Sequence, residues 1–211
     1  YKPAVVFLNG RYWGIHNMRE KIGKWYVGDN HPEVDIENLD MLFDNFNLIE
    51  GDIIHYWHMI DFLDNTMIFN EQAYDSLQQL LDIKNYTDYF ASEIYYSNLD
   101  WPNNNIKYWR PKRESGRWRY IMFDLDPGMG MNTSPSFNML DRVLHDSFPY
   151  TDNPQILQKM LQYEDYEHDF INRFADHINT SFKPERANAI IDRFQDRLEP
   201  EIDEHIDRWG Q

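Results

Sequence analysis

The segment from Ile106 to Phe123 constrains the fold of this chain more than any other part of the sequence. Two aromatic-rich runs, IKYWR and RWRYIMF, are separated by the turn-forming residues PKRESG. Alternation of aromatic and basic residues is typical of β-strands, and a short polar link joins two such strands as a hairpin. Because hairpin strands are antiparallel, the two outer ends lie side by side. The sequence therefore predicts that Asn105, before the first strand, and Asp124, after the second, are neighbours in space.

A further hairpin is predicted at the start of the chain, in AVVFLNGRYWGIHNM. Its apolar runs are joined by Asn9-Gly10, a pair favoured in two-residue type I′ turns. Short strands are expected at LDMLF and FNLIE. The residues from 25 to 38 read as a mixed segment with a loop at Asp29, Asn30 and Pro32.

Helical spacing of apolar residues dominates the remaining segments. The apolar positions 53, 54, 57, 60 and 63 predict a helix over Ile53–Leu63. Other helices are expected over Glu71–Leu81 and Thr87–Tyr96, from Pro154 with Asp152 or Asn153 as its cap, over Tyr163–Phe182 and over Pro184–Trp209. The order hairpin, helices, hairpin, helices indicates an α+β fold with a mostly helical second half.

Composition excludes several classes of protein. The chain has 211 residues and a net charge of -16, which argues against nucleic-acid binding because phosphate backbones require a basic face. An acidic surface instead suits divalent cations or a basic protein partner. The absence of cysteine excludes disulfides, thiolate zinc sites and cysteine nucleophiles. The longest apolar run, Ala4–Leu8, is far too short for a membrane span.

The stretch NLDWPNNNIKYW adds a second carboxylate to the hairpin ends. Asp100 lies on the loop that leads into the hairpin, with four residues between it and Asn105. Two carboxylates and one amide therefore converge, and such oxygen ligands suit a hard cation such as Mg²⁺. In phosphoryl transfer, an Asp and an Asn hold the metal while another Asp orients the attacking hydroxyl.

These motifs resemble a known family. VVFLNGRYWGIHNMREKI followed by NLDWPNNNIKYWRPKRESGRWRYIMFDLDPGMG is similar to the CotH family of spore-coat-type atypical protein kinases. The resemblance extends up to Gly130 and implies a divergent protein-kinase-like fold, with β-hairpins and a mostly helical larger lobe. It further implies one domain over residues 1–211, in which residues 1–24 end the small lobe and connect the lobes, and residues 25–211 form the larger lobe.

The resemblance also assigns roles to residues. Asp100 matches the catalytic Asp of the family, Asn105 and Asp124 match its metal-binding Asn and Asp, and Asp126 is a second candidate carboxylate. The implied cofactors are ATP and Mg²⁺ or Mn²⁺. The implied reaction is transfer of the ATP γ-phosphoryl group to a Ser hydroxyl of a protein substrate, for which a basic protein would suit the acidic surface.

The segment after the first hairpin is expected near the nucleotide. Glu20 matches a Glu of the family, and Lys21 and Ile22 follow it in the connection between the lobes. The Lys and Glu with which kinases hold the nucleotide phosphates are expected upstream of Tyr1, so the chain is interpreted as lacking the start of the small lobe. DLDPGMG departs from the kinase Asp-Phe-Gly. By resemblance, the setting is a bacterial cell envelope, a secreted protein or a spore coat.

Alternatives remain for each of these features. Asp100 and Asn105 can form a turn in which Asx side chains bond local backbone groups, and Asp124 and Asp126 can be solvated carboxylates at a strand end. A kinase-like module that binds without turnover, or a helical metal-dependent hydrolase using the same carboxylates, are competing functions. The abundant aromatic residues favour core packing over a carbohydrate-binding surface.

Two histidine patterns suggest further metal sites. His55, His58 and Asp61 have helical spacing but lack an evident additional ligand, so a solvated helix face is the simpler interpretation. Asp165 and His168 resemble half of a di-iron helix motif, which a helical bundle would need twice.

Overall fold

The structure is a computed structural model that describes residues 2–146, 148 and 151–210. Within these ranges it contains eight helices and two small antiparallel sheets, which confirms the predicted α+β class. The chain divides into two compact units. The hairpin unit comprises the residues up to 22 together with those from 176 onward, and the core unit comprises residues 23–175. The division into residues 1–24 and 25–211 as parts of two lobes stays a prediction.

The hairpin unit begins with the predicted N-terminal hairpin. Strands β1 (Lys2–Leu8) and β2 (Arg11–Met18) are antiparallel, and Leu8 pairs with Arg11 across the turn. Asn9 and Gly10 have φ angles of 51° and 77°. Positive φ at both central residues is the requirement of the type I′ turn, so the Asn-Gly signal is confirmed.

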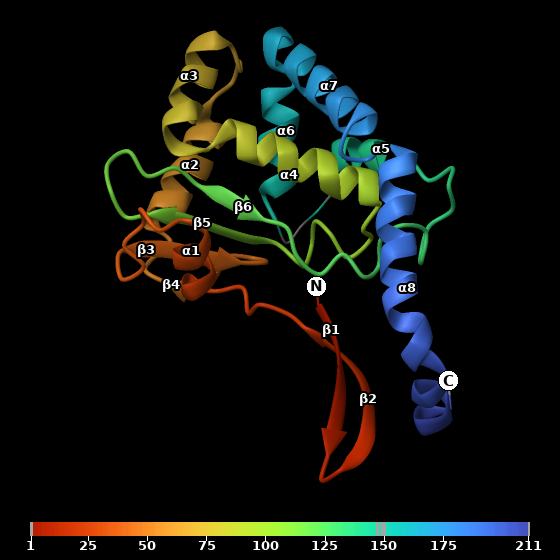
Figure 1. The fold of residues 1–211 in the computed structure, drawn as a ribbon. Helices are drawn as coiled ribbons and strands as arrows, with labels where there is room; N and C mark the ends of the chain where they lie inside the picture. Colours follow the sequence, from red (N-terminus) through yellow and green to blue (C-terminus); the bar gives the residue numbers. More distant parts are fainter. Residues whose placement is uncertain (1, 147, 149–150, 211) are drawn as a thin grey trace. The chain divides into compact units, whose positions relative to one another are not determined.

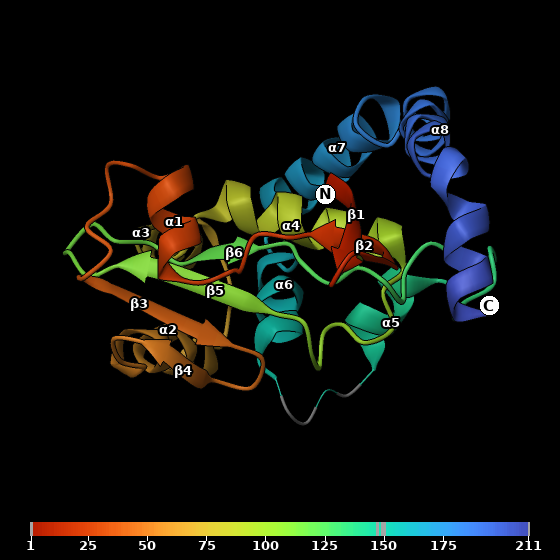
Figure 2. The same ribbon diagram turned by 60° about the horizontal axis from the view of Figure 1, so that its bottom comes forward.

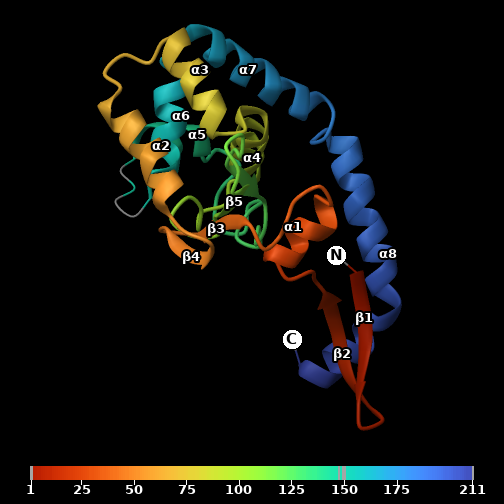
Figure 3. The same cartoon turned by 90° about the vertical axis from the view of Figure 1, so that its left-hand side faces the viewer.

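Helix α8 (Pro184–Trp209) packs against β2 in the same unit (Figure 3). The indole N–H of Trp209 donates to the backbone oxygen of Trp13 at 2.9 Å, and the backbone N–H of Ile15 donates to His205 Nδ1 at 3.0 Å. Between these two contacts lies Gly14, with φ 123°. A Cβ on Gly14 would lie 2.7 Å from the Trp209 indole nitrogen, so only glycine permits this close approach.

The core unit contains a four-stranded antiparallel sheet in the order β4-β3-β5-β6 (Figure 2). The strands are β3 (Leu39–Phe43), β4 (Asn47–Glu50), β5 (Lys107–Pro111) and β6 (Arg119–Ile121). The predicted hairpin of residues 106–123 is confirmed, and β5 also pairs with β3. The register pairs Lys107 with Ile121, so the residues before Lys107 and after Ile121 leave the sheet at the same end of the hairpin.

Among its described residues, the core unit contains the starts of seven helices, and α4 packs against β6 (Figure 1). They are α1 (Lys24–Asn30), α2 (Ile54–Asn65), α3 (Glu71–Leu80), α4 (Ile83–Tyr96), α5 (Met139–His145), α6 (Asn153–Met160) and α7 (Glu164–Asn179). Helix α5 contacts both α4 and α6, and the boundary between the two units falls within α7. In the described ranges, no helix is long and apolar enough to cross a membrane.

Aromatic side chains fill the interior of the core unit. Trp101, Tyr108 and Trp118 are completely buried. The rings of Tyr108 and Tyr120 stack with centroids 5.3 Å apart, and the Tyr120 hydroxyl donates to Asn153 Oδ1 at 2.5 Å. Many of the aromatic residues therefore serve packing, as the sequence indicated, and the Tyr120 hydroxyl finds its partner inside the core.

Helices α1 and α4 differ most from the sequence-based expectation. The segment from 25 to 38 was expected to be mixed, but α1 forms over Lys24–Asn30 because Val27 is completely buried, and tertiary packing outweighs the weak helix propensity of Gly28 and Asp29. Helix α4 begins at Ile83 rather than Thr87, since the Asp82 side chain caps it by accepting a hydrogen bond from the Asn85 backbone at 3.2 Å.

Candidate active site

The turn that carries Asp100 begins where α4 ends. Ser97 caps the helix in the left-handed conformation, with φ 54°. The side chain of Asn98 is buried, and its Oδ1 accepts the backbone N–H of Asp100 at 3.2 Å. The backbone oxygen of Asp100 in turn accepts the N–H of Asn104 at 2.9 Å. An Asx turn is thus formed by Asn98 rather than by Asp100, and the Asp100 side chain is exposed.

Asn105 and Asp124 meet at the open end of the β5–β6 hairpin, as predicted. Asn105 Nδ2 donates to the backbone oxygen of Asp124 at 3.3 Å. Both residues have positive φ, 63° and 56°, which turns the chain out of the sheet on each side. Asn105 is half-buried and Asp124 is exposed. The antiparallel register of the hairpin therefore brings an amide and a carboxylate-bearing residue together from positions 19 apart.

A further carboxylate, that of Asp44, lies next to Asn105 and was not predicted from the sequence. It lies in the turn between β3 and β4, and its Oδ1 accepts the Ile106 backbone N–H at 3.2 Å. The Asp44 N–H donates to the Ile106 oxygen at 2.8 Å. Burial raises the pKa of Asp44, and hydrogen bonds from the Ile106 and Asn105 backbones partly oppose this rise. Asp44 thus fixes the backbone next to Asn105; its only sequence signal was an Asp-Asn pair between two short strands.

The DLDPGMG segment docks on the end of α4. The N–H of Met129 donates to the backbone oxygen of Tyr96 at 2.7 Å, and the N–H of Gly128 donates to Leu125 at 2.9 Å. A Cβ on Gly128 would lie 2.8 Å from the Tyr96 oxygen, so glycine permits this contact. Asp126 lies exposed on the same segment. The helix that ends before the Asp100 turn therefore also anchors the loop that begins at Asp124.

Glu20, Lys21 and Ile22 lie between β2 and α1, outside regular secondary structure. Glu20 and Lys21 are exposed and Ile22 is half-buried. These residues belong to the hairpin unit, whereas the other predicted site residues belong to the core unit. Their role in nucleotide binding stays a prediction.

The chemistry of the donor set suits a hard cation. Because Asn105 uses its Nδ2 for the bond to the Asp124 backbone, its Oδ1 remains as a possible ligand, and the Asp124 side chain is exposed. Mg²⁺ takes one or two protein carboxylates and leaves its other positions to water and phosphate, which this set fits. Across the described residues, no group of three or more His, Cys, Asp or Glu side chains is placed to hold a metal ion. His55 instead accepts the Trp118 indole N–H at 3.1 Å.

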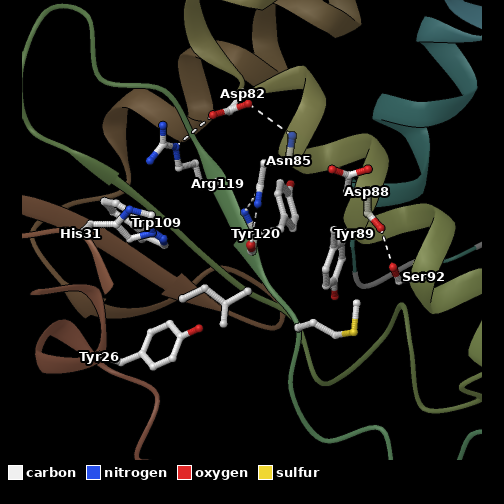
Figure 4. A pocket seen from close by; sticks show the side chains of 12 residues that line it. Tyr26, His31, Asp82, Asn85, Asp88, Tyr89, Ser92, Trp109, Arg119 and Tyr120 are labelled. Carbon is white, nitrogen blue, oxygen red and sulfur yellow. Dashed lines mark hydrogen bonds and ion pairs between the residues drawn. The ribbon is translucent and has the colours of Figure 1, made fainter. Parts of the chain in front are cut away.

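A cavity of about 400 Å³ in the core unit was not predicted (Figure 4). Tyr26, His31 and Trp109 provide aromatic surface on one side of it. Its Asp and Arg side chains are paired, since Arg119 Nε donates to Asp82 Oδ2 at 3.0 Å and Arg173 Nη2 donates to Asp88 Oδ2 at 2.9 Å. The wall formed by β6 continues through Met122 toward Asp124. The cavity therefore offers aromatic surface rather than unpaired charge, two residues along the chain from a candidate metal ligand.

Comparison with known proteins agrees with the motifs. The profile of the family described as CotH kinase protein matches residues 1–211. The chain belongs to this family. No curated protein matches the chain, and neither does any solved structure. Membership confirms the resemblance carried by the two hairpins and their flanking motifs, and it indicates a kinase-like protein.

Proposed function

We propose that this CotH family chain is the kinase-like domain of an atypical protein kinase that transfers the ATP γ-phosphoryl group to a Ser hydroxyl of a protein. The observation that supports this proposal is the contact between Asn105 and Asp124 at the open end of the β5–β6 hairpin. Protein kinases need an Asn and an Asp close together for their metal ions, after a loop that carries a catalytic Asp.

The roles of the residues follow from this chemistry. The acceptor hydroxyl oxygen forms a bond to the γ-phosphorus, the bond from that phosphorus to the β,γ-bridging oxygen breaks, and ADP leaves. The exposed Asp100 carboxylate orients the hydroxyl and accepts its proton. Asn105, Asp124 and the second candidate Asp126 would hold Mg²⁺ or Mn²⁺, and the bound metal would neutralise charge on the phosphates.

Substrate and nucleotide selection involve other parts of the chain. The net charge of -16 favours a basic protein segment as acceptor, because complementary charge accelerates encounter. Glu20, Lys21 and Ile22 contribute to nucleotide binding in this proposal, by their match to the connection between the lobes in the CotH family.

The test measures ATP binding and phosphoryl transfer in the full-length protein. Calorimetric titration with ATP, with and without Mn²⁺, compares the wild type with Asp124→Asn and with Glu114→Gln. Glu114 is an exposed residue in the turn at the opposite end of the same hairpin, so its variant controls for loss of one negative charge. We expect Asp124→Asn to weaken metal-dependent ATP binding by at least ~10-fold, and Glu114→Gln to leave it unchanged.

Transfer is followed with labelled ATP and two Ser-containing peptides, one rich in Lys and Arg and one rich in Asp and Glu. Phosphorylation of the basic peptide supports the proposal. Metal-dependent ATP binding without transfer to any acceptor would instead support a binding module that lacks turnover. ATP binding that needs no metal, or that Asp124→Asn leaves intact, refutes the assigned metal site.

A further inference from the structure

The backbone on both sides of Asp100 is held by one arginine. Arg142, on α5, donates from Nη1 to the backbone oxygen of Leu99 at 3.2 Å and to that of Trp101 at 3.0 Å. These two carbonyl groups belong to the residues that immediately precede and follow Asp100. A single guanidinium therefore holds the backbone on both sides of the exposed Asp100 carboxylate.

A second hold on the same turn comes from α4. Glu93 is completely buried, and its Oε2 accepts a hydrogen bond from Asn98 Nδ2 at 3.3 Å. The other end of the Asn98 amide accepts the backbone N–H of Asp100. Asn98 thus links a buried helix residue to the Asp100 backbone, and it uses both ends of its amide to do so.

The surroundings of Glu93 are unusual for a helix that serves only as support. Burial raises the pKa of Glu93 to about 7, while the hydrogen bond from Asn98 and the nearby Tyr89 hydroxyl oppose this rise. Tyr89, also on α4, is the titratable group that faces it, and Tyr120 of β6 packs against Tyr89. Glu93 Oε1, the Tyr89 hydroxyl and the Trp101 indole N–H are buried and make no hydrogen bond of standard geometry among the described residues. Polar groups held in this way are costly, and such groups gather at functional sites.

Partial burial of the Arg142 guanidinium also costs free energy. Burial lowers its pKa, and the carboxylate that opposes this effect, Asp146, lies at 3.9 Å with its side chain 61% exposed. An exposed ion pair of this kind contributes little to stability. The two carbonyl bonds are therefore the main polar interactions that Arg142 makes, and both of them act on the Asp100 turn.

We propose that Arg142 and the Glu93–Asn98 pair are positioning residues, which hold the Asp100 backbone from α5 and α4 so that the carboxylate meets the acceptor hydroxyl in one orientation. This proposal rests on the proposed kinase function. Misplacing a catalytic group by about 1 Å can reduce the rate by about 100-fold without changing substrate binding. Loss of the Arg142 hold should therefore lower kcat and leave the KM for ATP nearly unchanged.

The experiment compares Arg142→Met, Arg142→Lys and the control Asp146→Asn in the full-length protein. The control removes the exposed partner of Arg142 and keeps both carbonyl bonds. We expect Arg142→Met to lower kcat by at least ~10-fold, with the KM for Mn²⁺·ATP within about 2-fold of wild type. Arg142→Lys, which can bond a carbonyl but lacks the planar fork, should recover part of kcat, and Asp146→Asn should match the wild type.

Amide hydrogen exchange gives a readout that does not depend on activity. The N–H groups of Asp100 and Asn104 are hydrogen-bonded within the turn. Faster exchange at these two amides in Arg142→Met, with unchanged exchange in the sheet, supports the proposal, and Arg142→Lys provides the same comparison if the Met variant does not fold. Unchanged exchange at the turn, or a fall in kcat shared by Asp146→Asn, overturns it. Absence of phosphoryl transfer in the wild type refutes the kinase function, whereas the exchange result still decides whether Arg142 holds the turn.

Discussion

The burial of Glu93 predicts a measurable dependence of the free energy of unfolding on pH. Its carboxyl group is completely buried on α4, and burial raises its pKa from 4.5 to about 7. A raised pKa means that the folded protein holds a proton that the unfolded chain releases near pH 4.5. Folding is therefore favoured by this group at low pH, and the contribution is lost as the pH rises through about 7.

The size of the effect follows from the two pKa values. Each pKa unit corresponds to about 1.4 kcal/mol, so the rise from 4.5 to about 7 corresponds to about 3 kcal/mol in the free energy of unfolding. Most of this change, about 2 to 3 kcal/mol, falls between pH 5 and pH 8. Glu93→Gln keeps the shape and an oxygen acceptor for Asn98 but cannot ionise, so it should lack this part of the pH dependence.

The assay is urea denaturation of the wild type, Glu93→Gln and the exposed control Glu114→Gln at several values from pH 5 to pH 8. Other groups titrate in all three proteins, so the informative quantity is the difference between each variant and the wild type. We expect Glu93→Gln to become progressively more stable relative to wild type as the pH rises. The Glu114→Gln curve should stay parallel to wild type. A Glu93→Gln curve that is also parallel would refute the reasoning, because Glu93 would then be ionised in the fold at pH 5 as it is in the unfolded chain.

Two further variants test close contacts in the core unit. Gly128→Ala places a Cβ 2.8 Å from the Tyr96 backbone oxygen and should lower the free energy of unfolding by about 1–3 kcal/mol, whereas Gly23→Ala, which meets no atom within 4 Å, should have a much smaller effect in the same urea titration. Asp40→Ala should cost about 3–5 kcal/mol, because Asp40 is completely buried and its loss leaves Arg110, 2.9 Å away, as an unpaired buried charge. A cost below about 1 kcal/mol for Asp40→Ala would show that water reaches Arg110 and replaces the carboxylate.

Local sequence signals predicted the features that depend on local geometry. Asn9-Gly10 fixed the first turn because few residue pairs accept positive φ twice in succession. The second hairpin placed Asn105 beside Asp124 because antiparallel pairing follows from the strand pattern and needs no other part of the chain. In both cases the information lies within about twenty residues of sequence.

Interactions between distant segments could not be predicted in this way. The pairing of β3 with β5 joins Asp40 to Arg110, and neither strand has a sequence feature that identifies the other as its partner. Arg142 contacts backbone oxygens 43 and 41 residues away. Every residue has a backbone oxygen, so the sequence does not show which of them accepts the bond. Glu93 lies in FASEIYYS, where a Glu is an ordinary helix residue until the fold buries it. The residues that hold the candidate site in place therefore could not be predicted from the sequence, whereas its exposed residues could.

The contacts within the hairpin unit affect the order in which segments of the chain can pack during synthesis. The bond between Ile15 and His205 joins residues 190 apart, so β2 leaves the ribosome long before the helix that covers it. At about 5–20 residues per second, the delay is roughly 10 to 40 s. An isolated two-stranded hairpin is only marginally stable in water during such a wait. Strands β1 and β2, synthesised before the core unit, thus acquire their full packing only after α8 has been made, and during that interval they are open to chaperones and to pairing with other nascent chains.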